Sequence, residues 1–589
     1  MREFVKTDKL CPVRLLSATA LALVLTACHS PTYLAITAEQ DALGDSSTGG
    51  EAASTGGQAT TTTGEAGGTV SDSAADTGNS SSEAAEVTGD ASGSSDMGGV
   101  SATGDTGSSG EETGDTDTGE PVALPSIVSL SLPAKVYAAG PVQLEVQAIH
   151  TISVLVEVDG VDLGELQDAG DGLFIGTLPV RGAVDNGLHE VKVVAKQGPH
   201  EVSDGANYEV STPKPGTMAW FKAGPPGSRT NRVALTAEGD VLEAGQVEIN
   251  KITRPGLRKR SGLTGAELWS VTLDTREGSV ADLAVLPDGR VWVAMNVRKP
   301  GDPSPQPRIA LFDAAGKFTG VEAHGDIGRV VRSIAADAAG GCFAAGYASM
   351  GKDLDIAYWR ITAAGVQTLG DAWDFVPDKV LNEEHSFSEF AMDVVIQDDV
   401  AWVIGASNGK HELLAPLETR GVLVPMDLHT GTVKDPVIVA AKGPYYTQSV
   451  FFGAGHHPLG VLVTGYGCDA TCTNYQIVSS LYGPTGLRLW QTPDAAPGSL
   501  RYGSDVVLDS QGRALVAGFV TEKGTPRGYL SARRVGGEDV LPLLEHWFPA
   551  SAAPSEALGV LVDAYDRIFA GGYITANGST QARLVLIHG

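Results

Sequence analysis

The stretch VVLDSQGRALVAG (residues 506–518) has the pattern of a strand, a tight turn and a second strand. Aliphatic residues alternate on either side of the turn sequence Asp509-Ser-Gln-Gly512, and Asp and Gly are residues that tolerate the φ angles of tight turns. Alternation with a period of two is typical of a strand with one buried face. The stretch therefore predicts a β-hairpin.

This hairpin unit occurs seven times in the C-terminal part of the chain, and its copies end 50 to 60 residues apart. Further strand-like stretches, such as RIALFDAAG and RGVLVPMDL, lie between the copies. Four strands per copy and seven copies predict an all-β chain with a seven-bladed β-propeller over residues 216–589. The other six copies are VALTAEGDVLEAG (233–245), LAVLPDGRVWVAM (283–295), IAADAAGGCFAAG (334–346), VVIQDDVAWVIG (394–405), FFGAGHHPLGVLVTG (451–465) and VLVDAYDRIFAGG (560–572).

The unit resembles the seven-bladed propeller repeats of bacterial secreted and surface proteins, in which a turn and Leu-Trp precede the next copy. TGAELWSVTL and TGLRLWQTP match this feature around Trp269 and Trp490. The same letters resemble the tryptophan-docking repeat of quinoprotein dehydrogenases, but only two blades match and the chain has no pair of adjacent cysteines. We therefore interpret both tryptophans as residues that pack between blades.

The two ends of the repeat region indicate how the propeller closes. The chain stops at ARLVLIHG, after the third strand of the last copy, so that copy lacks an outer strand. Trp220 precedes Gly245 by 25 residues, a spacing close to that of the tryptophans before three other copies. An open propeller would expose strand edges. We predict that Met218–Lys222 completes the seventh blade beside Leu584–Ile587.

Residues 123–212 show shorter alternating runs and the hairpin signal Asp159-Gly160. They predict a β-sandwich that is similar to the immunoglobulin-like modules of bacterial surface proteins, although it has no cysteine pair. The resemblance implies a spacer or stalk, and a separate binding module is the alternative. Pro213 and Pro215 mark the boundary to the propeller.

The N-terminus has the pattern of an export signal. A basic segment ends at Arg14 and is followed by an apolar run to Leu25, which is too short to span a bilayer. Leu25-Thr26-Ala27-Cys28 resembles the lipobox of bacterial lipoproteins. The resemblance implies that residues 1–27 are removed and that acyl chains on Cys28 attach the protein to a membrane. The alternative is an ordinary secretory signal with an incidental cysteine.

Residues 28–122 predict a disordered tether. They are rich in Gly, Ser, Thr, Asp and Glu, and from His29 to Ala134 there are seventeen acidic residues and no Lys or Arg. A coil of this length has an r.m.s. reach of about 50 Å. The formal net charge of −30 argues against a nucleic-acid partner. Because His29 is not the Asp that marks inner-membrane retention in enteric bacteria, an outer-membrane or cell-surface location is favoured.

Few residues outside the repeats suggest chemistry. Cys342 occupies a small apolar position of the repeat and predicts a buried core thiol. Cys468 and Cys472 lie in a loop, where a disulfide is favoured over half of a metal site. We interpret His456-His457 as residues of a surface turn, and Asn382–Phe390 as a long decorated loop and a second-choice ligand contact. No catalytic, metal-binding or cofactor-binding motif is recognisable.

These features predict a lipid-anchored protein of the cell envelope that presents the propeller as a non-catalytic binding or scaffolding module. Its partner would be an extracellular or periplasmic protein or glycan, bound at a loop face that includes the segments YGCDATCTNY and NEEHSFSEF. The alternative is an extracellular propeller enzyme, either a hydrolase or a quinoprotein-like dehydrogenase. Such an enzyme would place carboxylates or histidines together at the mouth of the central channel.

Overall fold

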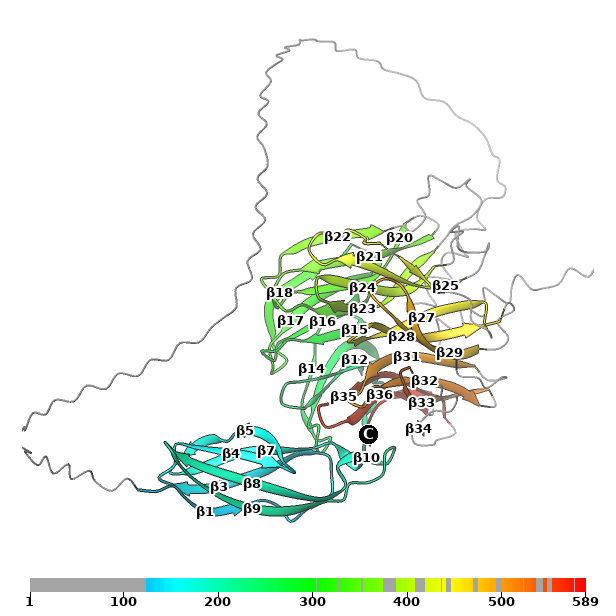
Figure 1. The fold of residues 1–589 in the computed structure, drawn as a ribbon. Coiled ribbons are helices and arrows are strands. Elements are labelled where there is room, and N and C mark those ends of the chain that lie inside the picture. The colour runs from blue at the N-terminus through cyan, green and yellow to red at the C-terminus, as the bar shows by residue number, and fades with distance from the viewer. Residues whose placement is uncertain are drawn as a thin grey trace, which may run out of the picture. The chain divides into compact units, whose positions relative to one another are not determined.

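A computed structural model describes a β-sandwich and a β-propeller (Figure 1). Within the described part, no helix is long and apolar enough to cross a membrane. The predicted signal peptide, Cys28 and the predicted tether lie outside the described residues. The described residues are 123–302, 304–326, 328–350, 353–373, 388–407, 419–435, 437–440, 446–469, 475–493, 500–522, 524–536, 544–547, 553–576 and 578–589.

The sandwich consists of two sheets, and a short 3₁₀ helix, η1 (Gly182–Asp185), precedes β8. The first sheet has the order β1 (Ser126–Ser131), β3 (Gly140–Ile149), β7 (Leu173–Val180) and β6 (Gln167–Gly170). The second has the order β2 (Lys135–Val136), β9 (His200–Val210), β8 (Gly187–Gln197), β4 (Ser153–Val158) and β5 (Val161–Glu165).

Alternation along the strands explains the core of the sandwich. Buried and exposed residues alternate along β3, and its inward residues pack with those of β7, β4, β8 and β9 in one apolar cluster. Asp159 and Gly160 form the two-residue turn between β4 and β5, with φ angles of 49° and 81°. The predicted hairpin at this pair is therefore confirmed.

The propeller consists of seven sheets of four antiparallel strands, which we number as blades 1 to 7. Blade 1 consists of β11 (Arg229–Leu235), β12 (Val241–Ile249), β13 (Ile252–Arg260) and β14 (Glu267–Thr272). Blade 2 consists of β15 (Gly278–Val285), β16 (Val291–Arg298), β17 (Pro305–Phe312) and β18 (Phe318–His324). Blade 3 consists of β19 (Arg329–Ala336), β20 (Cys342–Met350), β21 (Asp353–Ile361) and β22 (Gln367–Trp373). Blades 4 and 5 are β23 (Glu389–Gln397), β24 (Val400–Ser407), β25 (Arg420–Asp427), β26 (Ile438–Val439); and β27 (Gln448–His457), β28 (Gly460–Cys468), β29 (Tyr475–Tyr482), β30 (Arg488–Pro493). Blades 6 and 7 are β31 (Arg501–Leu508), β32 (Arg513–Glu522), β33 (Thr525–Arg534), β34 (Leu544–Trp547); and β35 (Ser555–Val562), β36 (Arg567–Ala576), β37 (Ser579–His588), β10 (Met218–Pro226).

The first strand of each blade lies in a closed inner ring. Each of these strands contacts the first strand of the next blade, and β35 of blade 7 contacts β11 of blade 1. Apolar clusters fill the space between blades: one of them joins residues of β28 and β29 to residues of β31 and β32. The predicted seven-bladed β-propeller is therefore confirmed.

The stretch 506–518 shows why six of the seven copies end in glycine. β31 and β32 join at a tight turn in which the Asp509 carboxylate accepts hydrogen bonds from the backbone N–H groups of Gln511 and Arg513, at 3.0 and 2.8 Å. A Cβ at Gly518 would lie 1.8 Å from the carbonyl oxygen of Tyr502, so only glycine fits. Equivalent glycines in five further blades are equally close to a first-strand carbonyl, and Met295 stands at this position in blade 2.

The two ends of the propeller meet in blade 7. β10 pairs with β37, with Met218 opposite Ile587 and Lys222 opposite Leu584. The indole N–H of Trp220 donates to the carbonyl oxygen of Leu263 at 3.0 Å. Figure 1 shows the C-terminus beside β10. The closure predicted from the spacing of Trp220 is confirmed.

Deletion of residues 217–223 removes most of β10 and exposes the edge of β37. We expect it to lower the free energy of unfolding by on the order of 5 kcal/mol, because most of the backbone ladder with β37 and the packing of Trp220 are lost. Thermal unfolding followed by circular dichroism measures the effect. A seven-residue deletion within residues 60–80 is the control and leaves the transition unchanged. A shortened propeller that melts as hot and as cooperatively as the intact one would contradict the closure.

Candidate functional site

The predicted anchor and disulfide fall partly outside the described residues. Cys28 and Cys472 lie outside them, so the lipid anchor and the Cys468–Cys472 pairing stay predictions. The placement of Cys468 in a loop is wrong, because it is the last residue of β28, paired with Gln448 and Tyr475. It is buried and disulfide-bonded. Of the long loop Asn382–Phe390, only residues 388–390 are described, and β23 begins at Glu389.

The structure confirms the core role of three residues. Cys342 is a free thiol with no exposed surface, and burial raises its pKa well above the usual value. Trp490 is buried between blades 5 and 6. Trp269 packs against the cluster that joins blades 1 and 2. All three therefore belong to inter-blade packing.

The interpretation of His456-His457 as turn residues is wrong. Both are the last residues of β27, because pairing with β28 continues to His457 opposite Gly460. Nδ1 of His457 accepts a hydrogen bond from the backbone N–H of Leu459 at 3.0 Å, and burial together with the neighbouring His456 lowers its pKa. Among the described residues, no group of three or more His, Cys, Asp or Glu side chains could hold a metal ion.

A ring of seven equivalent residues, which we call the bulge ring, lies on the innermost strands. In every blade the pairing of the first and second strands shifts by one residue, as in a β-bulge. The bulge ring is formed by the residues that follow the extra residue. These are Arg232, Asp282, Ser333, Asp393, Gly453, Asp505 and Gly559.

The three aspartates of the bulge ring connect neighbouring blades. Oδ1 of Asp393 accepts the backbone N–H of Val394 in its own blade at 2.8 Å. Its Oδ2 accepts the N–H of Ala454 in the next blade, also at 2.8 Å. Asp282 and Asp505 repeat this pattern and accept N–H groups of the next blades at 3.0 and 2.9 Å. Each carboxyl group therefore joins two innermost strands.

Ser333 places one proton between two carboxyl groups. Its Oγ lies 2.6 Å from Oδ2 of Asp282 and 2.5 Å from Oδ1 of Asp393. A hydroxyl group has a single proton and can donate to only one of them. The second short contact needs a proton on the carboxyl group itself. The geometry therefore indicates that Asp282 and Asp393 hold one proton between them.

Arg232 is the only cation of the bulge ring. Its Nε lies 3.7 Å from Oδ1 of Asp282, and one terminal nitrogen donates to the carbonyl oxygen of Leu558 in blade 7 at 3.1 Å. One guanidinium cannot balance three carboxylates, of which those of Asp282 and Asp393 are buried and that of Asp505 is partly buried. Burial accordingly raises the pKa of Asp282 to about 6 and that of Asp505 to about 7, against the opposing effect of Arg232. Burial also raises the pKa of Asp393.

The bulge ring can hold and release protons, and its carboxyl oxygens are already engaged by backbone N–H groups. No prediction from the sequence included these residues. The sequence does carry a signal for the three aspartates of the bulge ring. In ADLAV, MDVVI and SDVVL, an Asp stands before two aliphatic residues, just ahead of the aligned hairpin. An extra residue in a strand reverses the side-chain alternation, so the repeat pattern alone did not show which face carries these residues.

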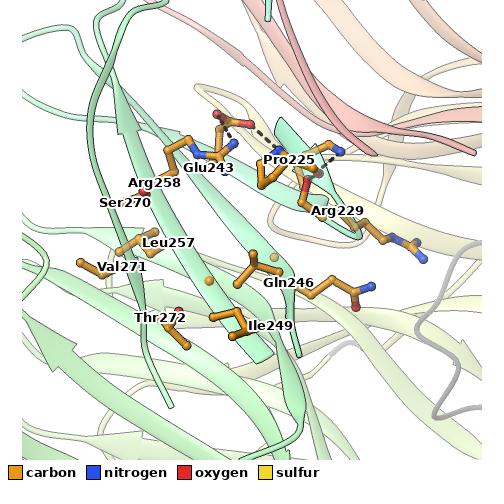
Figure 2. A pocket seen from close by; sticks show the side chains of 16 residues that line it. Pro225, Arg229, Glu243, Gln246, Ile249, Leu257, Arg258, Ser270, Val271 and Thr272 are labelled. Atoms are coloured by element: carbon orange, nitrogen blue, oxygen red, sulfur yellow. Dashed lines mark hydrogen bonds and ion pairs between the residues drawn. The ribbon is translucent and has the colours of Figure 1, made fainter. Parts of the chain in front are cut away.

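A cavity of about 250 Å³ lies between blade 1 and the closing strands of blade 7 (Figure 2). Glu243 and Arg258 meet at one end of it, and Ile249 and Thr272 lie at the other. Pro225 of β10 contributes a wall from blade 7. No sequence motif indicated this cavity, because its walls come from strands at both ends of the propeller.

Glu243 is the centre of a buried polar network beside the cavity. Its Oε1 accepts a hydrogen bond from Nε of Arg260 at 2.5 Å, and its Oε2 accepts one from the Thr230 hydroxyl at 2.9 Å. Arg258 lies 3.8 Å from Glu243 and 3.1 Å from Glu267. Its buried Nε makes no well-aligned hydrogen bond. Two arginines and two glutamates therefore balance in charge in this network, and the Nε of Arg258 meets Glu267 as an ion pair.

No family model and no curated protein sequence matches the chain. Among solved structures, the chain is similar to the polysaccharide lyase Uly1 with a TM-score of 0.36 and 10% identity, over 61% of this chain and 90% of that one. The propeller domain of the Trilobed protease of Pyrococcus furiosus is similar with a TM-score of 0.36 and 10% identity, over 63% of this chain and 95% of that one. Drosophila Semaphorin 2a is similar with a TM-score of 0.41 and 8% identity, over 64% of this chain and 76% of that one. Likeness at this level bears on neither activity nor ligand.

The bulge ring makes the stability of the propeller depend on pH. The pKa of Asp505 is about 7 in the folded chain and about 3.9 in the unfolded one, so between these values only the folded state keeps the proton. Its contribution to stability is therefore complete below pH 4 and is lost as the pH rises through 7. We expect Asp505→Asn to reduce the fall in the free energy of unfolding between pH 5 and pH 8 by on the order of 2 kcal/mol.

Denaturant unfolding at the two pH values measures this difference. Asp326→Asn changes a side chain that is 81% exposed and serves as the control, which keeps the pH dependence of the unaltered protein. An Asp505→Asn protein with the same pH dependence as the unaltered protein would show that Asp505 binds no proton in this range.

Proposed function

We propose that this chain is a lipid-anchored protein of the cell envelope whose propeller is a non-catalytic binding module. The sandwich, which resembles immunoglobulin-like modules, acts as a spacer, and residues 28–122 act as the tether. The partner is an extracellular or periplasmic protein or glycan. The proposal that the module is non-catalytic rests on one observation. The three aspartates of the bulge ring use their carboxyl oxygens to hold neighbouring strands together.

The aspartates of the bulge ring support a structural use of the propeller centre. A propeller hydrolase that used these carboxyl groups as acid or base would need them free to reach a substrate. Asp282, Asp393 and Asp505 instead accept two backbone N–H groups each, and every pair of N–H groups comes from two neighbouring blades. A group that joins strands in this way cannot turn toward a substrate without opening the inner ring.

The anchor follows from Leu25-Thr26-Ala27-Cys28 and from the basic and apolar segments before it. Acyl chains on Cys28 give stable attachment, because each buried CH₂ group contributes about 0.8 kcal/mol. An acidic tether would then keep the folded part away from an anionic membrane surface. The proposed location is the outer membrane or the cell surface.

Replacement of Cys28 by Ala tests the anchor. We expect loss of lipidation and a precursor that the lipoprotein signal peptidase leaves uncut, because the acylated sulfur is absent. Mass spectrometry of the N-terminal peptide and membrane fractionation measure both effects. Cys11→Ala, which removes the other cysteine of the N-terminal region, is the control and leaves processing unchanged. A correctly cut, equally membrane-bound Cys28→Ala protein would contradict the proposal.

Binding is tested with the full-length protein on glycan and protein arrays, in a detergent without a sugar headgroup. We expect saturable binding to one class of partner and no turnover of it, because the proposed module has no catalytic group. The variant without residues 217–223 is the control, since the opened propeller should lose its preorganised surface. Cleavage or oxidation of the bound partner would establish the enzymatic alternative.

A further inference from the structure

Blade 1 lacks a side chain that all other blades have. The position on the third strand opposite the repeat-ending residue is Gly256 in blade 1. Arginine, alanine, valine and tyrosine side chains occupy it elsewhere. The equivalent residues are Arg308, Ala357, Val422, Val478, Tyr529 and Arg583. The cavity of Figure 2 is lined by Gly256, where this side chain is missing.

The fold requires glycine at position 245 but not at position 256. A Cβ at Gly245 would lie 1.9 Å from the carbonyl oxygen of Arg229, as in the other blades that carry this glycine. A Cβ at Gly256 would have Cγ1 of Val247 as its nearest neighbour, at 3.3 Å, and the backbone φ at Gly256 is not positive. A small shift of one side chain would admit a residue like those in the other blades. The space beside Gly256 is therefore a property of this blade and not of the repeat.

The chemistry of the cavity selects a neutral ligand with hydroxyl groups. At the polar end of the cavity, Arg258 and Arg260 are balanced by Glu243 and Glu267. The other cation of the lining, Arg229, lies over the ring of Tyr573 at 4.3 Å, so the polar end itself has no net attraction for an ion. A guanidinium beside a carboxylate suits a hydroxyl group, which accepts from the first and donates to the second. Thr272, opposite Gly256, adds a hydroxyl group at the exposed outer strand. Aliphatic walls such as Val247 suit the C–H faces of a ring.

The size of the cavity limits the ligand to a single ring. An apolar cavity of about 150 Å³ is enough to hold benzene. The present cavity of about 250 Å³ exceeds this by the volume of a few further atoms. A hexose or an N-acetylated hexosamine fits this range, whereas a disaccharide must leave one ring outside.

We propose that the cavity between blade 1 and the closing strands of blade 7 binds one neutral sugar residue of a glycan. Arg258 donates to a ring hydroxyl group, and the space beside Gly256 receives the ring. This inference rests on the proposed binding role of the propeller and names the ligand class of one site in it.

The test measures binding of single sugars to the full-length protein by isothermal titration and by saturation-transfer NMR. The ligands are glucose, galactose, mannose and N-acetylglucosamine, with glucuronate as the charged analogue. We expect saturable binding of at least one neutral sugar and weaker binding of glucuronate. Gly256→Leu fills the cavity and should weaken binding at least tenfold, whereas Gly256→Ala, the matched control, should stay within about twofold. Arg258→Met keeps the bulk of the side chain but removes its donors, and should weaken binding about tenfold.

Thermal unfolding shows that the variants are folded; in Gly256→Leu the gain from filling the void is set against the shift of Val247 that the new Cβ requires. Gly256→Val is the second filling variant should the leucine prove too large. Sugar binding that Gly256→Leu and Gly256→Val leave unchanged would overturn the site but not the binding role of the propeller. Loss of a protein partner instead of a sugar in these variants would overturn the ligand class. Absence of binding to every sugar and every array partner would overturn both.

Discussion

The extra residue in the first strand of every blade is the constraint on which the rest of the propeller depends. It lets the first-strand carbonyl oxygen approach the second strand so closely that glycine follows there in six of seven blades. It also turns the next side chain, such as Asp393, toward the neighbouring blade. The repeat-ending glycine and the inter-blade hydrogen bonds are thus two results of one backbone irregularity.

The seven positions of the bulge ring are not chemically equivalent. Aspartates stand in blades 2, 4 and 6, and glycines in blades 5 and 7. A Cβ at Gly453 would lie 2.5 Å from Cα of Asp505, so blade 5 approaches blade 6 through its backbone instead of through a side chain. Buried carboxyl groups are costly unless they are hydrogen-bonded, and here each one accepts hydrogen bonds from two backbone N–H groups.

The architecture of the propeller could be predicted because its hairpin unit repeats along the sequence. The candidate sites could not, because they depend on departures from the repeat, namely the one-residue bulges and Gly256. Seven aligned hairpins gave the number of blades, and the spacing of Trp220 gave the closing strand, because both depend on distances along the chain. The bulge ring was missed because an inserted residue reverses the alternation from which buried faces are inferred. Gly245 and Gly256 are both glycines in strands, and only the distances to their neighbours distinguish a required glycine from one that leaves space.

The pairing of β10 with β37 has a mechanical consequence. A force applied to the chain from its N-terminal side reaches the propeller first through β10, whose ladder with β37 runs from Met218 to Pro226. The strand under tension is thus the one that holds the ring shut, and its backbone hydrogen bonds would share the load before any other blade is strained. Rupture of that single ladder would release both ends of the domain at once. The resistance of the propeller to pulling is therefore set by one strand pair.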